Sequence, residues 1–250
     1  MNRYQSVRLF CLPYAGGTAR IFADWAGDLP SWIDVVPLEL PGHGFRFDEP
    51  VCDELPRLLA DLREQLLGRL DRRYAVFGHS LGAMLGYELI QALQAEGESA
   101  VHFFPSGAGA PHIPTRNPAP GYSDEQLRTH IAGLGGTPRE LVENDELMEL
   151  MFPMLRADFT IADRYRARAR ASLDCPVTAF CGADDGEAPP GDMLAWRLHT
   201  RGPCSVRLLA GDHFFVHSAR QDLLTLIAST LHPECAYADQ TPAERGAANR

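Results

Sequence analysis

Short, solidly apolar segments recur along the chain, and segments with helical spacing of their apolar residues separate them. Runs rich in β-branched and aromatic residues, without alternation, are typical of strands buried on both faces of a parallel sheet. The pattern therefore predicts an α/β fold with a mostly parallel central sheet flanked by helices. The predicted strands are Val7–Leu12, Val35–Leu40, Tyr74–Phe77, Val101–Pro105, Val177–Cys181 and Val206–Ala210, and the predicted helices are Leu55–Leu70, Met84–Ala95, Asp192–His199 and Gln221–Leu231.

The segment from about residue 110 to 171 breaks this alternation, because it contains no strand-like run. Ser123 and Gln126 form an S-x-x-Q capping box, which predicts the start of a helix. A second capping box is predicted over residues 137–140, with Pro138 at the first helical position. An insertion of this length between two strands predicts a helical lid.

The lid is expected to interrupt a single domain that spans residues 1–232. The polar segment 233–250 has little apolar pattern, and we expect it to be a mobile tail. The first residues lack the layout of a signal peptide, and no apolar run has the length of a membrane span, so we expect a cytoplasmic protein without membrane contact. Six scattered cysteines, without a C-x-x-C pair, predict reduced thiols and no zinc site.

Charge narrows the possible functions. The 250-residue chain has 33 acidic against 23 basic residues and a formal charge of −10, which argues against a nucleic-acid partner. Every basic residue is Arg, since the chain contains no Lys. Lysine Schiff-base chemistry and a Walker A phosphate loop are therefore excluded.

The strand predicted at Tyr74–Phe77 runs directly into a G-x-S-x-G sequence, Gly78 to Gly82, which leads into a predicted helix. In this strand–turn–helix context the motif is typical of a nucleophile elbow, and Ser80 is the candidate nucleophile. The turn that lifts Ser80 above the sheet edge crowds its neighbours, so the residues two before and two after it lack side chains.

A serine hydroxyl needs a base oriented by an acid, and in α/β-hydrolases these follow in the order Ser, Asp or Glu, His. His213 is the leading base because it directly follows a predicted strand, and His217 is the alternative. Asp185 is the favoured acid and Asp184 remains open, since the first Asp after a sharp Gly turn tends to make turn hydrogen bonds. Asp212 is disfavoured because adjacent residues seldom point at each other.

A developing oxyanion needs two backbone N–H groups. One is expected from Leu81, the residue after the nucleophile, and the other from the loop Pro13–Gly17 after the first strand.

Several of these stretches together resemble the stand-alone type II thioesterases that accompany nonribosomal peptide and polyketide synthases. The element G-x-S-x-G alone fits many hydrolases, but its combination with the others is specific. The matching stretches span nearly the whole chain and are LFCLPYAGG (Leu9–Gly17), PLELPGHG (Pro37–Gly44), FGHSLG (Phe77–Gly82), LGGTPRELVE (Leu134–Glu143), LRADF (Leu155–Phe159), GADD (Gly182–Asp185) and GDHFF (Gly211–Phe215).

The resemblance implies an α/β-hydrolase fold with a helical lid, and a triad of Ser80, Asp185 and His213. It also implies oxyanion donors at Ala15 and Leu81. The implied substrate is an aberrant or stalled acyl group, held as a thioester on the phosphopantetheine arm of an acyl or peptidyl carrier protein. No resident cofactor or metal is expected, because phosphopantetheine arrives with the carrier, and a monomer is expected.

Two further sets of residues are candidates for contacts with the substrate and the carrier protein. Tyr14 and apolar lid residues are candidate substrate contacts, although packing of the lid is the alternative for the lid residues. A run of arginines is a candidate contact for an acidic carrier protein, although a solvated helix face is the alternative. His43 in PGHG is interpreted as part of a structural turn. The lid residues are Met148, Met151, Phe152 and Met154, and the arginines are Arg164, Arg166, Arg168 and Arg170.

Other functions use the same residues. A carboxylesterase or lipase would act on free esters with the same triad, and an acyltransferase would pass the acyl group to an acceptor other than water. A catalytically idle module that recognises carriers would not need the acid and the base.

Overall fold

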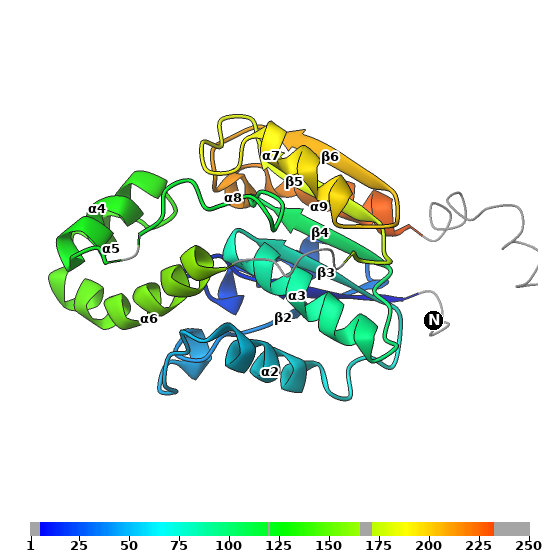
Figure 1. The fold of residues 1–250 in the computed structure, drawn as a ribbon, viewed down its shortest axis with the longest axis horizontal. Coiled ribbons are helices and arrows are strands. Elements are labelled where there is room, and N and C mark those ends of the chain that lie inside the picture. The colour runs from blue at the N-terminus through cyan, green and yellow to red at the C-terminus, as the bar shows by residue number, and fades with distance from the viewer. Residues whose placement is uncertain (1–5, 120, 166–171, 233–250) are drawn as a thin grey trace, which may run out of the picture.

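Six parallel strands form the central sheet of the computed structural model, which describes residues 6–119, 121–165 and 172–232 (Figure 1). The sheet order is β2-β1-β3-β4-β5-β6, so the chain starts near one edge, returns through the centre and proceeds to the other edge. The expected tail lies outside the described residues. The strands are β1 (Val7–Leu12), β2 (Ile33–Pro37), β3 (Tyr74–His79), β4 (His102–Ser106), β5 (Val177–Gly182) and β6 (Cys204–Leu209).

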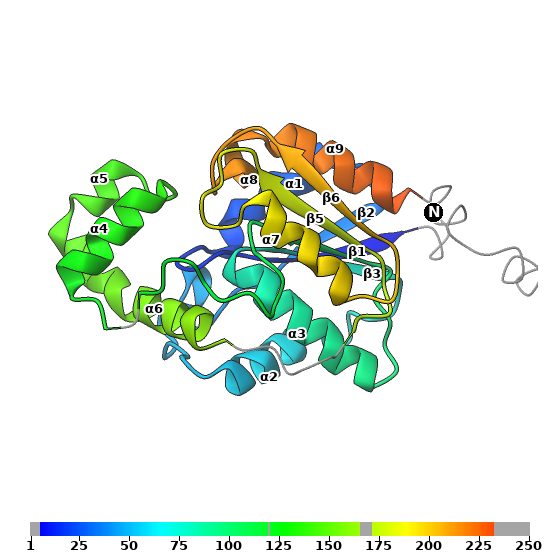
Figure 2. The same cartoon turned by 45° about the horizontal axis from the view of Figure 1, so that its top comes forward.

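Helices cover both faces of this sheet, and each face has its own apolar core. Leucines of α2 and α3, together with Trp196, pack on one face, while Trp25, Phe215 and leucines of α9 pack on the other. Figure 2 shows α2 and α3 on one side of the sheet and α9 on the other. The helical elements of this body are η1 (Ala19–Phe22), α1 (Trp25–Asp28), η2 (Gly44–Arg46), α2 (Leu55–Leu66), α3 (Leu81–Ala95), α7 (Pro190–Leu194), η3 (Ala195–Leu198), α8 (Phe215–Ser218) and α9 (Arg220–Leu231).

The α/β fold expected from the sequence is confirmed, but two strands differ from the expectation of complete burial. β2 and β6 are the edge strands, and both are only partly buried. Leu208 of β6 is 59% exposed. An edge strand lacks a neighbour on one side, and apolar composition alone does not reveal this position.

Helix boundaries also differ from the sequence-based ones. α3 begins at Leu81, immediately after Ser80, and not at Met84. α2 ends at Leu66, shortly before Gly68, whose positive φ of 74° is unsuited to a helix. The segment predicted as one helix from Asp192 is divided between the short α7 and the 3₁₀ turn η3.

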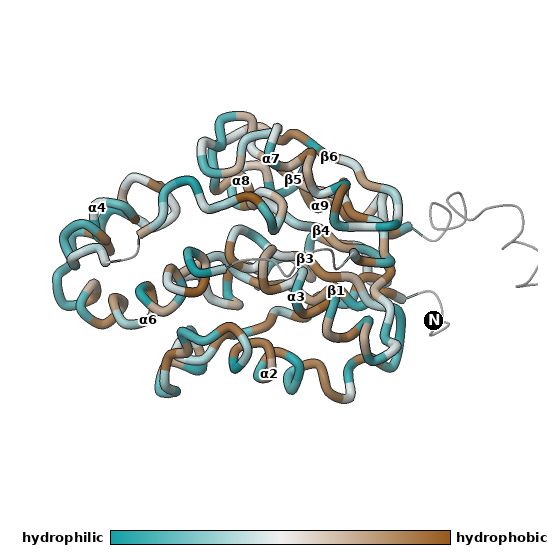
Figure 3. Tube along the Cα trace, viewed as in Figure 1, coloured by the Kyte–Doolittle hydropathy of each residue, from teal (hydrophilic) through white to brown (hydrophobic). Residues whose placement is uncertain are grey.

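In the part of the lid that the structure describes, three helices project from one end of the sheet (Figure 1). The capping box of Ser123 and Gln126 is present at the start of α4, but the second predicted box is wrong: Pro138 is the N-cap of α5 and no side chain caps that helix. Figure 3 shows hydrophilic and hydrophobic residues alternating along α6. The lid helices are α4 (Asp124–Leu134), α5 (Arg139–Val142) and α6 (Asp145–Arg164).

The lid has a core of its own. Met148 is fully buried there, and Leu127 and Ile131 of α4 belong to the same cluster. Across the described residues, none of the helices combines the length and the apolar character required to cross a membrane.

Candidate active site

Ser80 occupies a sharp turn between β3 and α3, with a backbone φ of 53° that side-chain-bearing residues rarely adopt. Its amide donates to the carbonyl of Ser106 at 2.8 Å, which ties the turn to β4. A Cβ at Gly78 would lie 2.1 Å from the carbonyl oxygen of Gly82, and one at Gly82 would lie 2.3 Å from that of Leu12. Both glycines are therefore required for this turn.

Sheet register brings the candidate acid and base together. Gly182 at the end of β5 pairs with Leu209 at the end of β6, and the loops that follow remain joined, since the amide of Asp184 donates to the carbonyl of Gly211. At this edge His213 Nδ1 lies 3.1 and 3.0 Å from the two carboxylate oxygens of Asp185. The tautomer with a proton on Nδ1 leaves Nε2 of His213 available for proton transfer.

The carboxylate of Asp185 is stabilised in its charged form. Burial alone would raise its pKa, but the hydrogen bond and charge of His213 and the amides of Ala188 and Glu187 together lower it. These amides donate to Oδ1 at 3.0 and 2.9 Å. Asp185 is 4% exposed and His213 is 8% exposed, so the pair lies largely out of water.

The alternative acids and base lie elsewhere. The side chain of Asp184 is exposed, and Asp212 Oδ1 accepts the amide of Phe214 at 2.9 Å. His217 lies on α8, and its Nε2 is 3.0 Å from the hydroxyl of Tyr14. Asp185 is the acid candidate that contacts His213. The sequence analysis favoured it because turn hydrogen bonds were expected at Asp184, but Asp185 itself accepts the turn amides.

One pocket joins the candidate groups. Ala15, Ser80, Leu81 and His213 all line it, and its empty space is about 730 Å³ including the open mouth. Leu81 is the first residue of α3, so its amide is one of the free N–H groups at a helix N-terminus. Among the described residues no hydrogen bond joins the Ser80 hydroxyl to His213, although both face this common space.

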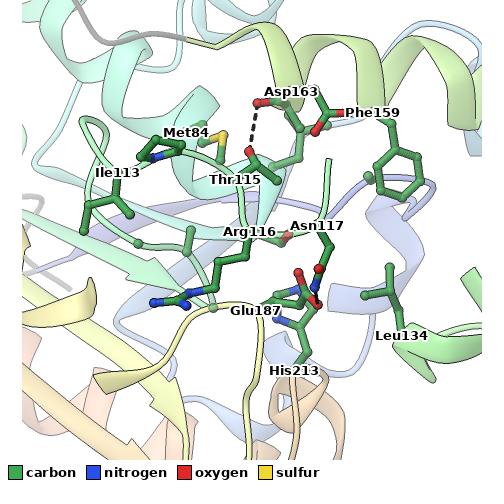
Figure 4. Close-up of a pocket in the computed structure, with 18 of the residues that line it drawn as sticks. Met84, Ile113, Thr115, Arg116, Asn117, Leu134, Phe159, Asp163, Glu187 and His213 are labelled. Carbon is green, nitrogen blue, oxygen red and sulfur yellow. Dashed lines mark hydrogen bonds between the residues drawn. The ribbon is translucent and has the colours of Figure 1, made fainter. Parts of the chain in front are cut away.

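Lid and body contribute opposite walls of this pocket. Figure 4 shows Phe159 and Asp163, both from α6, on one side and His213 on the other. Polar side chains from the loop after β4 complete the wall: Arg116 pairs with Asp192 at 2.7 Å, and a similar polar contact joins Asn117 to Glu187 at 2.5 Å.

A second pocket has an empty space of about 680 Å³ including its open part, and mainly apolar residues of the loop after β1 and of the lid line it. Tyr14 and Met151 line it, and it shares Ala15, Leu134 and Phe159 with the first pocket. The two pockets therefore meet beside the candidate oxyanion donor Ala15.

The other lid residues expected to contact substrate are placed differently. Met148, Phe152 and Met154 belong to the core of the lid and line neither of these two pockets. Of the arginines, Arg164 is exposed at the end of α6, while the remaining three, Arg166, Arg168 and Arg170, lie outside the described residues.

His79, which precedes Ser80, was not recognised as part of the site from the sequence. His79 Nε2 donates to the backbone carbonyl of His213 at 2.9 Å, and its Nδ1 lies 2.8 Å from the hydroxyl of Ser106. Burial and the neighbouring His213 lower the pKa of His79, so the ring is neutral and holds the base by its backbone. The position beside Ser80 in GHSLG was the available signal.

His43 was interpreted as part of a turn, but it is buried against the lid. Its Nε2 lies 2.9 Å from Oδ2 of Asp158 on α6, and its Nδ1 lies 3.0 Å from the carbonyl of Pro41. Within the described parts of the chain, no group of three or more His, Cys, Asp or Glu side chains is arranged to hold a metal ion.

The comparisons with known proteins agree with this geometry. The family model for the thioesterase domain matches residues 7–235. Linear gramicidin dehydrogenase LgrE of Brevibacillus parabrevis is 41% identical over 236 residues, which cover 92% of this chain and 90% of that protein. The word dehydrogenase belongs to the name of that relative; this chain contains no G-x-G-x-x-G sequence, the usual dinucleotide-binding turn.

Solved structures of thioesterases are also similar to this chain. RedJ, a thioesterase from the prodiginine pathway of Streptomyces coelicolor, has a TM-score of 0.84 at 38% identity, covering 89% of this chain and 85% of its own. The type II thioesterase BorB from the borrelidin biosynthetic cluster has a TM-score of 0.83 at 33% identity, covering 90% and 93%.

The chain belongs to the thioesterase family and has the α/β-hydrolase fold of its neighbours. The resemblance to type II thioesterases of peptide and polyketide assembly lines is confirmed, because its relatives and structural neighbours include thioesterases of such pathways. The prediction of a hydrolase that acts on thioesters is also confirmed.

Proposed function

We propose that this enzyme removes aberrant or stalled acyl groups from the phosphopantetheine arm of carrier proteins that belong to a peptide or polyketide synthase. The observation that carries the proposal is the Asp185–His213 pair, whose His213 lines the same pocket as Ser80 on its strained turn. The similarity to thioesterases of assembly lines supports this choice of substrate over free esters.

The proposed reaction begins when the oxygen of Ser80 attacks the thioester carbonyl carbon and His213 takes the serine proton. Asp185 keeps the imidazole in the required tautomer and stabilises its positive charge. The negative charge on the tetrahedral oxygen is held by the amides of Ala15 and Leu81.

Collapse of this intermediate breaks the carbon–sulfur bond, and His213 returns the proton to the leaving thiol. An acyl ester on Ser80 remains. His213 then removes a proton from water, which attacks the ester carbonyl, and a second collapse releases the carboxylic acid and restores the serine hydroxyl. The carrier protein leaves with a free phosphopantetheine thiol.

The reaction needs no resident cofactor or metal, since phosphopantetheine enters with its carrier and both proton transfers use His213. We further propose that the enzyme acts as a monomer in the cytoplasm, where its carrier proteins reside. The five cysteines among the described residues are free thiols, which suits a reducing compartment (Cys11, Cys52, Cys175, Cys181 and Cys204).

The test compares one short acyl group presented on a phosphopantetheine-bearing carrier protein, on free pantetheine and as a nitrophenyl ester. We expect a much higher kcat/KM on the carrier and no turnover by Ser80→Ala. Equal or better turnover of the simple ester would reject carrier proteins as the substrate and support a carboxylesterase. Transfer of the acyl group to an added alcohol or amine, in preference to water, would support an acyltransferase.

A further inference from the structure

A buried carboxylate on the lid helix holds the backbone of the candidate oxyanion loop. Asp158 Oδ2 accepts the amide of Gly16 at 2.7 Å, and Gly16 directly follows Ala15. Asp158 is 1% exposed, so water does not compete for this hydrogen bond. The peptide unit between Ala15 and Gly16, which directly follows the one that carries the Ala15 N–H, is thereby fixed from the lid side.

The same oxygen of Asp158 also contacts a histidine. His43 Nδ1 must carry a proton, because the carbonyl of Pro41, 3.0 Å away, only accepts hydrogen bonds. Nε2 lies 2.9 Å from the carboxylate, and both side chains are 2% exposed. Burial lowers the pKa of His43, but the hydrogen bond and charge of Asp158 outweigh burial and raise it. The raised pKa of His43 favours the protonated ring, in which both nitrogens donate: Nδ1 to Pro41 and Nε2 to Asp158.

Packing of Leu155 reinforces the contact between the lid helix α6 and Gly16. A Cβ built on Gly16 would lie 2.5 Å from Cδ2 of Leu155, one turn before Asp158 on α6. Leu155 and Asp158, three residues apart, share one face of the helix and both press on Gly16. Gly16 has a φ of 74°, so a residue with a side chain is excluded here both by conformation and by space.

We propose that Asp158, held by His43, is a positioning residue that sets the direction of the Ala15 amide in the oxyanion hole and thereby couples lid position to catalysis. An oxyanion donor acts only when it points at the place where charge develops, and a displacement of about 1 Å costs on the order of 100-fold in rate. The lid then contributes to the chemical step through Asp158 without touching the reacting atoms. This inference rests on the proposed role of Ala15.

The test uses a series of variants at position 158, assayed for kcat and KM on an acyl thioester that the wild type hydrolyses. Asp158→Asn retains an oxygen acceptor without charge, and Asp158→Ala removes the acceptor. We expect kcat to fall about tenfold in Asp158→Asn and about 100-fold in Asp158→Ala, while KM changes less than about threefold. His43→Gln, which removes the ring that lies 2.9 Å from the Asp158 carboxylate, is expected to resemble Asp158→Asn.

Binding of an alkylboronic acid separates positioning from general damage to the fold. Boron accepts the oxygen of Ser80, whose proton passes to His213, and the tetrahedral adduct places an oxygen in the oxyanion hole. We expect the inhibition constant to rise in parallel with the loss of kcat. Thermal melting of every variant shows whether the protein is folded under the assay conditions.

Asp61→Asn is the matched control. Asp61 pairs with Arg46 at 2.6 Å and so stabilises the same loop that carries His43, but it does not contact Gly16. We expect its kcat to stay within about twofold of the wild type. A folded Asp158→Ala with the kcat of Asp61→Asn, or a change in KM alone, would overturn the proposal. This outcome is independent of the carrier test, because any substrate that the wild type turns over reports kcat.

Discussion

The body and the lid of this enzyme are built differently. The body packs two large apolar cores on the faces of a six-stranded sheet, whereas the lid has one small core shared by its three helices. The candidate nucleophile, acid and base all belong to the body and follow β3, β5 and β6. The lid supplies pocket walls and the buried Asp158.

Precision and adaptability are divided between these two regions. Ser80, Asp185 and His213 are each fixed by hydrogen bonds to neighbouring backbone or by sheet register, which holds reacting groups within the narrow limits that catalysis needs. Met151, the lid methionine that lines the second pocket, has a flexible side chain that accommodates varied shapes. We therefore expect changes in the body to alter the rate of the chemical step and changes in the lid pocket to alter substrate choice.

The largest effect is expected from Ser80→Ala, which removes the hydroxyl of the candidate nucleophile. We expect kcat to fall at least about 10⁴-fold, because neither Asp185 nor His213 replaces the missing oxygen. Release of free thiol from an acyl thioester measures the rate. Residual turnover within about tenfold of the wild type would show that the chemistry takes place elsewhere.

The next effect is expected at the acid. Asp185→Asn should lower kcat about 10³- to 10⁴-fold, since an amide no longer stabilises the imidazolium of His213 and permits the wrong tautomer. Asp184→Asn is the control, because its side chain is exposed, and its kcat should stay within about twofold. Steady-state kinetics of the two variants decide between them, and a reversed order would assign the acid to Asp184.

A smaller effect is expected in the second pocket, which Met151 of the lid lines. Met151→Trp places a larger ring in the apolar pocket and should reduce the ratio of kcat/KM for a decanoyl over an acetyl thioester about tenfold. Met148→Ala is the comparison, because this fully buried core residue should lower stability by about 2–5 kcal/mol and leave the ratio unchanged. Equal shifts of the ratio in both variants would erase the distinction between pocket and core.

The smallest effect concerns stability and pH. In the folded state, burial raises the pKa of Asp185, but the hydrogen bond and charge of His213 and the two turn amides lower it further, so the pKa lies below its usual 3.8. The unfolded chain then binds more protons between the two values, so this carboxylate stabilises the fold fully above the unfolded value and loses its contribution as pH falls through the lowered value. Urea unfolding of the wild type and Asp185→Asn should therefore give stabilities that differ less in acid than at neutral pH, and a constant difference would contradict this.

Much of the site was predictable because its parts are local in sequence. The elbow around Ser80 needs glycines at fixed positions, and His213 and Asp185 follow apolar runs that the sheet places side by side. The capping box of Ser123 was predictable for the same reason, since capping depends on residues three apart.

Other features depend on contacts that no local pattern encodes. His43 and Asp158 are 115 residues apart, and only the packing of the lid on the body brings them together. The burial of Met148 and the exposure of β6 likewise follow from what lies beside them in space. The apolar spacing of α6 predicts a buried face but does not reveal whether that face meets a core or a pocket.

The backbone of Ser80 has a further meaning for the evolution of this enzyme. A non-glycine residue at a φ of 53° and a ψ of −115° costs on the order of 1–3 kcal/mol, which is a sizeable part of the stability of a typical domain. A glycine at this position would relieve the backbone strain but would lack the hydroxyl of the candidate nucleophile. Stability and the proposed reaction thus place opposite demands on this one position.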